Sequence, residues 1–135
     1  MSTHQNKITG HLKIVLGKLS RTQYKFIAGF WTALTIYLSL ISAREASKFN
    51  VWDIVGFDKL AHLIFYAIFS FVWCMALNKT GKSRNFVLIF SICFGVLMEI
   101  FQLYLFNGRS FEVFDILANI AGSYCGTVLF KNIIN

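Results

Sequence analysis

Seven polar side chains in an otherwise apolar sequence have the chemical types that form binding or catalytic sites. Carboxylates and an imidazole exchange protons, and a guanidinium beside an imidazole can hold a phosphate. Acidic and histidine side chains are also suitable ligands for a divalent metal. The sequence has no HExxH-like spacing and no CxxC pair, so it predicts neither a metal site nor a cofactor. The seven residues are Asp58, His62, Glu99, Gln102, Arg109, Asp115 and Asn119.

Long apolar runs must position these residues. The chain has 135 residues, of which 56% are hydrophobic and only 14% are charged, whereas soluble domains carry about 25% charged residues. The composition predicts a polytopic membrane protein with an all-α fold, a bundle of four transmembrane helices joined by short loops. The expected spans are residues 24–42, 58–77, 86–106 and 111–130, within one domain of residues 24–135.

The positive charge is concentrated in two places, which predicts the orientation. Residues 1–25 contain five Lys and Arg residues and no acidic residue, and the connection 78–85 contains three more. Basic loops stay at the cytoplasmic face, so both termini are expected in the cytoplasm and the other two connections outside. Residues 1–23 form a basic cytoplasmic or interfacial segment, because leucines at helical spacing lie opposite Lys13 and Lys18. A solvated tail is the alternative, and nucleic-acid binding is not expected.

In this topology the polar residues gather at the outer ends of three spans. Glu99 and Gln102 share a helix face, as do Asp115 and Asn119. Gly122 and Gly126 continue the second of these faces, and glycine at four-residue spacing predicts that this face packs against the other helices. A charged group at the centre of a membrane helix costs about 2.5–3.5 kcal/mol on insertion scales, so such groups are usually paired and functional.

Several of these polar residues also have a purely structural interpretation. Asp58 and Asp115 could simply cap their helices. His62 and Asn119 could serve only as interhelical hydrogen-bonding groups. Glu99 lies inside an apolar stretch and needs a partner or a proton.

The motifs that contain these residues resemble the VanZ-like family of membrane proteins. The matching stretches are Asp58-Lys59-Leu60-Ala61-His62 with Tyr66, Glu99-x-x-Gln102, and Gly108 to Phe111 followed by Asp115 to Asn119 with Gly122 and Gly126. The resemblance covers the second span to the end of the chain, whereas the N-terminal part matches only as a generic span. It implies a bacterial plasma or inner membrane location and a link to resistance against the glycopeptide teicoplanin. It names no reaction.

The residues support three classes of function. The leading hypothesis is an outward-facing polar pocket that binds an anionic cell-envelope lipid or its head group, for example a lipid-linked cell-wall intermediate. Arg109 would contact the phosphate, and His62 with Glu99 would supply a proton-sensitive partner. The second class is an enzyme acting on a lipid head group, with His62 as general base or nucleophile and Glu99 in support. The third is a polar network that only stabilises the bundle or a homo-oligomer.

Overall fold

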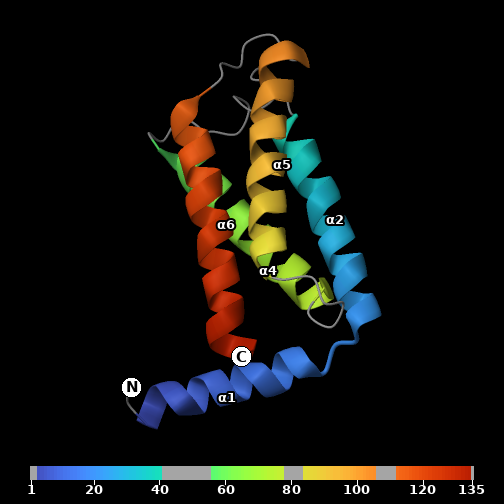
Figure 1. The fold of residues 1–135 in the computed structure, drawn as a ribbon, viewed down its shortest axis with the longest axis vertical. Helices are drawn as coiled ribbons and strands as arrows, with labels where there is room; N and C mark the ends of the chain where they lie inside the picture. Colours follow the sequence, from blue (N-terminus) through green and yellow to red (C-terminus); the bar gives the residue numbers. More distant parts are fainter. Residues whose placement is uncertain (1–2, 41–55, 78–83, 106–111, 135) are drawn as a thin grey trace.

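Five helices account for nearly all of the chain that the structure describes. The structure is a computed structural model, and it describes residues 3–40, 56–77, 84–105 and 112–134. The helices are α1 (Thr3–Gly17), α2 (Arg21–Ser39), α4 (Phe57–Leu77), α5 (Arg84–Leu105) and α6 (Val113–Ile134). The all-α prediction is therefore confirmed. Helices α2, α4, α5 and α6 form a bundle, and α1 lies across one end of it (Figure 1).

Local chemistry fixes where the helices begin. Ser20 and Gln23 form a capping box at the start of α2, with Ser20 Oγ accepting from the Gln23 backbone N–H at 3.2 Å and the Ser20 N–H donating to Gln23 Oε1 at 2.7 Å. Gly56 precedes α4 with a φ of +83°, a conformation that side chains disfavour. Asp115 lies in the first turn of α6, where its carboxylate suits the helix dipole.

The predicted spans differ from the helices mainly at their ends. Spans 58–77 and 86–106 agree with α4 and α5 to within two residues. The first predicted span, 24–42, corresponds to α2. This helix begins earlier, at Arg21, because Ser20 caps it there. The last helix runs over Val113–Ile134 and not over 111–130, because the Glu112 carbonyl accepts the first N–H bonds of α6 and the pattern continues past Lys131.

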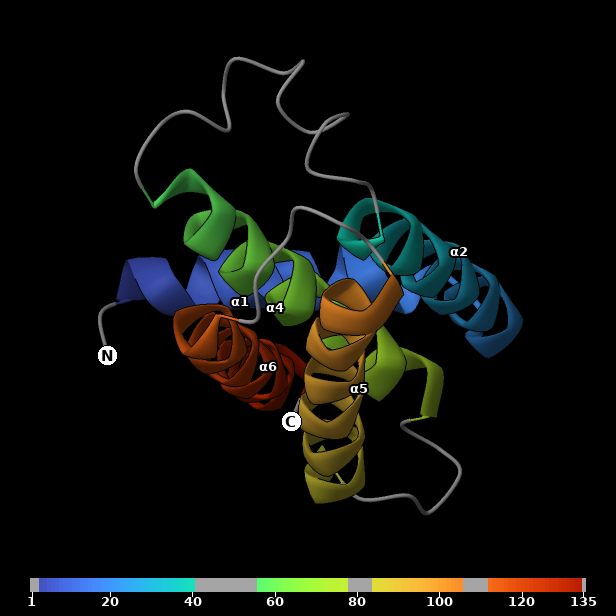
Figure 2. The same ribbon diagram turned by 90° about the horizontal axis from the view of Figure 1, so that it is seen from above.

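Helix α4 is the centre of the bundle. It contacts α2, α5 and α6, and from above it lies between α2 and α6 (Figure 2). Helices α2 and α5 run away from α1, whereas α4 and α6 run towards it (Figure 1). Helices α4 and α6 therefore begin at the end of the bundle far from α1, and α2 and α5 finish at the same end. We call this the distal end.

Two glycines bring α4 and α6 into close contact. A Cβ atom on Gly122 would collide with the Leu63 carbonyl oxygen, and one on Gly126 would collide with the Ala67 carbonyl oxygen. Small residues allow backbones to approach in this way in membrane helices. The prediction that these glycines mark the packed face of the last helix is confirmed.

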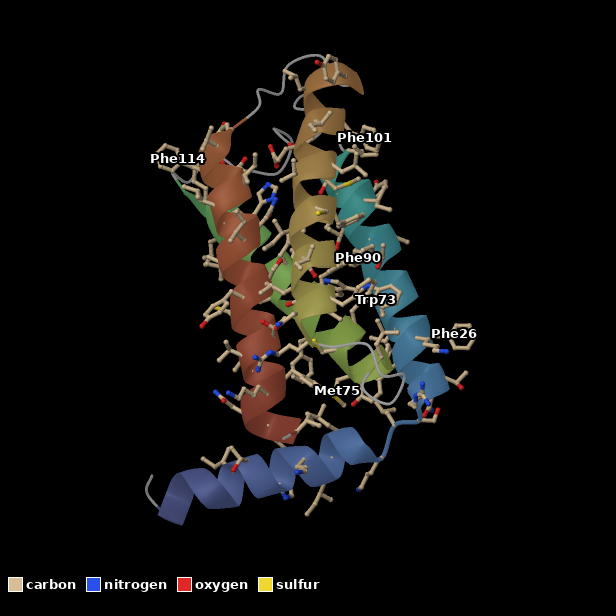
Figure 3. All side chains as sticks on the ribbon, viewed as in Figure 1. Phe26, Trp73, Met75, Phe90, Phe101 and Phe114 are labelled. Carbon is tan, nitrogen blue, oxygen red and sulfur yellow. The ribbon has the colours of Figure 1, made fainter. Side chains whose placement is uncertain are left out.

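Several polar groups lie inside this bundle, whereas many large apolar groups lie on its surface. Glu99, Gln102 and Asn119 are at most 1% exposed, whereas Phe26 is 76% and Phe114 is 69% exposed. Figure 3 shows both phenylalanines pointing away from the bundle. This inversion of the usual pattern fits a protein surrounded by lipid. Three of the described helices, α4, α5 and α6, are long and apolar enough to cross a membrane, and α2 is less apolar than these three.

Candidate functional site

Polar residues from three helices meet at the distal end. Asp58 and His62 lie in the first turns of α4, Glu99 lies near the end of α5, and Asp115 and Asn119 lie in the first turns of α6. The close α4–α6 contact at Gly122 brings the polar side chains of α4 and α6 within reach of each other. The structure thus gathers most of the residues that the sequence singles out.

His62 bridges α4 and α6 through both ring nitrogens. Its Nδ1 lies 2.9 Å from Asn119 Oδ1, and its Nε2 lies 3.8 Å from Asp115 Oδ2. Because an amide oxygen only accepts hydrogen bonds, Nδ1 carries the proton and donates to Asn119. The other ring nitrogen then faces the Asp115 carboxylate.

Glu99 approaches the same point from α5. The side chain is fully buried, and one ligand atom from each of His62, Glu99 and Asp115 lies within 4.8 Å of the other two. Three acid–base groups from three helices therefore share one small volume. Side chains arranged in this way can exchange a proton, coordinate a cation or bind a polar ligand.

Two buried hydrogen-bond donors lie beside this cluster without an assigned acceptor. The Tyr66 hydroxyl and the Asn119 side-chain nitrogen have no hydrogen-bond partner among the described residues, although both residues are only 1% exposed. Both side chains pack against Gly95, one turn from Glu99 on α5, at 3.1 and 3.2 Å from where a Cβ would be. Buried donors without an acceptor are costly, so an oxygen atom supplied from outside the described chain would suit them.

Lys59 is the residue that the sequence analysis missed. Its Nζ lies 2.7 Å from Asp58 Oδ2, 2.8 Å from Glu112 Oε2 and 3.3 Å from Asp115 Oδ1. The sequence placed it in the Asp58–His62 motif and gave it no role. Two signals were available: Lys59 follows Asp58 directly, and Glu112 precedes Asp115 by one helical turn. Asp58 is thus part of an ion-pair network and not only a helix cap.

Gln102 points to a different helix from the other site residues. Its side-chain Nε2 donates to the Ser39 carbonyl oxygen at 2.6 Å, so it joins α5 to the last turn of α2. The structure does not place it in hydrogen-bond contact with His62 or Asp115. Arg109, the expected phosphate contact, lies outside the described residues.

The Gln102 hydrogen bond predicts a structural effect. We expect Gln102→Leu to lower the free energy of unfolding by about 1 kcal/mol, because it removes the donor from a buried carbonyl. Thermal unfolding in detergent measures this, with Asn85→Leu on the exposed side of α5 as the control. Unchanged stability together with lost ligand binding would show that Gln102 contacts a ligand instead.

An apolar pocket of about 150 Å³ adjoins the polar cluster. It lies between α2 and α4 and reaches α5 through Gln102, and Leu38, Ala61 and Phe65 supply much of its apolar wall. His62 and Tyr66 line it too. One His62 ring therefore borders both the apolar pocket and the polar cluster, so the two form one amphipathic site.

A match to a known protein family covers this whole arrangement. A family model described as VanZ/LLP1 matches residues 4–135. The chain belongs to this family. The resemblance that the motifs of the last three spans suggested is thereby confirmed, and it extends to α1 and α2. No curated protein and no solved structure matches the chain significantly. Membership in the VanZ/LLP1 family therefore supports a membrane protein, and what the site binds must be argued from its geometry.

Proposed function

We propose that this VanZ/LLP1 protein spans the membrane with four helices and binds a membrane lipid at its distal end. Helix α2 would be the fourth span. Its 19 residues correspond to about 28 Å at about 1.5 Å per residue, close to the thickness of the hydrocarbon layer. Phe26, Phe30 and Tyr37 are exposed along it, which suits contact with lipid.

Helix α1 supports an orientation for the bundle. It lies across the end opposite the site (Figure 1), and Ile8, Leu12 and Val15 form an exposed apolar stripe along it. The side chains of Lys13 and Lys18 are exposed as well. A basic helix of this kind suits the cytoplasmic interface, where anionic lipids attract it. Both termini would then be cytoplasmic and the distal end would face the outer leaflet.

The observation that carries the lipid proposal is the position of His62. It borders an apolar pocket on one side and a buried cluster of hydrogen-bonding groups on the other. A lipid has the same division, because an apolar chain is joined to a polar head group. The acyl chain of the lipid would enter between α2 and α4, and its head group would lie among the polar residues of α4, α5 and α6.

The charges of the described site residues limit how the site could hold an anionic head group. In the described part of the site, carboxylates outnumber the ammonium group of Lys59. A phosphate would therefore need further positive charge, and Arg109, directly after the Asn107-Gly108 pair, is the candidate. In a bacterial envelope a lipid-linked cell-wall intermediate has this chemistry. Such binding would connect the protein to glycopeptide resistance.

Filling the pocket tests the proposal. We expect Ala61→Phe to reduce copurified lipid at least tenfold, because Ala61 lines the pocket and a ring would occupy it. Native mass spectrometry with lipids retained measures this, with Ala33→Phe as the matched control because Ala33 is exposed on α2. Arg109→Ala should remove phosphate-bearing lipid only. Equal lipid on Ala61→Phe and Ala33→Phe would contradict binding in this pocket.

A catalytic role is the second candidate, and the His62 ring favours it. With Nδ1 bound to Asn119, the Nε2 atom faces Asp115 beside the pocket, a position from which a base can take a proton from a ligand. His62→Gln should then abolish turnover of the lipid that native mass spectrometry finds on the wild type and preserve its binding. Loss of both in a folded variant would favour binding alone.

A further inference from the structure

We propose that His62, Glu99 and Asp115 bind a divalent transition-metal ion such as Zn²⁺ or Mn²⁺ at the distal end. The sequence predicted no metal site, because no ligand motif occurs along the chain. The structure supplies the ligands from three helices instead. The proposal does not depend on the nature of the lipid.

The positions of the ligand atoms suit one ion. Histidine nitrogen and carboxylate oxygen lie about 2.0–2.2 Å from zinc, so two ligands of one ion are at most about 4.4 Å apart. His62 Nε2 and Asp115 Oδ2 are 3.8 Å apart, and the full set with Glu99 falls within 4.8 Å. Small rotations of these side chains would close the set around an ion.

The charge and burial of the ligands also favour a cation. Glu99 is fully buried, and the side chains of Asp115 and His62 are 6% and 11% exposed. Two carboxylates in a volume this poor in water repel each other unless positive charge lies between them. A divalent ion with a neutral imidazole and two carboxylates gives no net charge.

Asn119 holds His62 as a metal ligand must be held. Its amide oxygen accepts from Nδ1–H at 2.9 Å, which leaves the Nε2 lone pair towards the Asp115 carboxylate. Metal-bound histidines nearly always donate their second ring N–H to an oxygen in this way.

The buried donors beside the cluster indicate an additional oxygen ligand. The Tyr66 hydroxyl and the Asn119 side-chain nitrogen lack an acceptor among the residues that the structure describes. Both pack against Gly95, one helical turn from Glu99. A water or head-group oxygen bound to the ion would accept from them. No hydrogen bond among the described residues satisfies these two donors.

A second acidic set nearby is less suited to a metal. Asp58, Glu112 and Asp115 also bring ligand atoms within 4.8 Å of one another. Lys59 Nζ already lies within 3.3 Å of all three carboxylates. Its ammonium group supplies positive charge to Asp58, Glu112 and the Oδ1 atom of Asp115, whereas the Oδ2 atom of Asp115 faces His62. The ion is therefore assigned to the histidine-containing set.

Metal loading of the purified protein tests the proposal. Protein in detergent is stripped with a chelator, incubated with Zn²⁺ or Mn²⁺, desalted, and analysed by plasma mass spectrometry. We expect one ion per chain in wild type. His62→Gln and Asp115→Asn should lose it, and Asn119→Ala should bind about 10–100-fold more weakly. His11→Gln on exposed α1 and Glu112→Gln in the second acidic set should retain it.

Cobalt absorption keeps the test independent of how the variants fold. Wild-type protein loaded with Co²⁺ should show the visible bands of a low-coordinate site, and Zn²⁺ should displace them. Absence of both bound metal and these bands in wild type would overturn the proposal. Equal binding by folded His62→Gln would overturn it as well, as would loss of binding in Glu112→Gln alone.

Discussion

Gly122→Ala is expected to prevent stable assembly of the bundle. The added Cβ would collide with the Leu63 carbonyl oxygen and would lie 3.0 Å from the Leu63 carbonyl carbon and 3.1 Å from the Ala67 nitrogen. These are backbone atoms, so no side chain can rotate to make room. Overpacking typically costs about 1–3 kcal/mol, and a clash between two backbones belongs at or above the top of that range. Separating α4 from α6 would also stretch the His62–Asn119 hydrogen bond.

Gly29→Ala is the matched control for this substitution. Gly29 lies in the bundle helix α2, and no side chain or neighbouring helix lies within 4 Å of its added Cβ. Alanine there should leave stability unchanged or raise it by up to about 1 kcal/mol, because alanine is the better helix former. The two variants are compared by their yield, their size-exclusion profile and their thermal unfolding in detergent. Similar unfolding temperatures would mean that α4 and α6 are not in backbone contact at Gly122.

The helices and the gathering of polar residues at one end were predictable, because both depend on local patterns. Apolar runs of about 20 residues define membrane helices. Antiparallel connections then return Asp58, Glu99 and Asp115 to the same end whatever the details of packing. Glycine at four-residue spacing in α6 likewise marked a close contact before its partner was known.

The partners of individual side chains were not predictable, because they depend on how each helix is rotated about its axis. Gln102 shares a face with Glu99, yet it bonds to the Ser39 carbonyl of α2 while Glu99 faces α4 and α6. Lys59 had no role predicted from the sequence, and only the packing of α4 against α6 brings it to Glu112. The ligand set of His62, Glu99 and Asp115 follows from the same crossing. No spacing along the chain encodes it.

Lys59→Met should produce the second large effect, because it removes the ammonium group from three carboxylates at once. Exposed pairs are worth about 0.2–1 kcal/mol, whereas breaking a buried pair costs about 3–5 kcal/mol. The Lys59 side chain is 35% exposed, and those of Asp58 and Glu112 are 30% and 42% exposed, but that of Asp115 is only 6% exposed. An intermediate loss of about 2 kcal/mol is therefore expected, most of it from the uncompensated charge on Asp115.

A double-mutant cycle locates that loss. If Asp115 carries it, adding Asp115→Asn to Lys59→Met should restore part of the stability, with a coupling energy of at least about 1 kcal/mol. Lys25→Met is the control, because Lys25 is exposed on α2 and should change stability by less than about 0.5 kcal/mol. Additive effects of Lys59→Met and Asp115→Asn would instead assign the loss to Asp58 and Glu112. Lys59 would then act at the rim of the site, and the charge on Asp115 would have to be balanced from the His62 side.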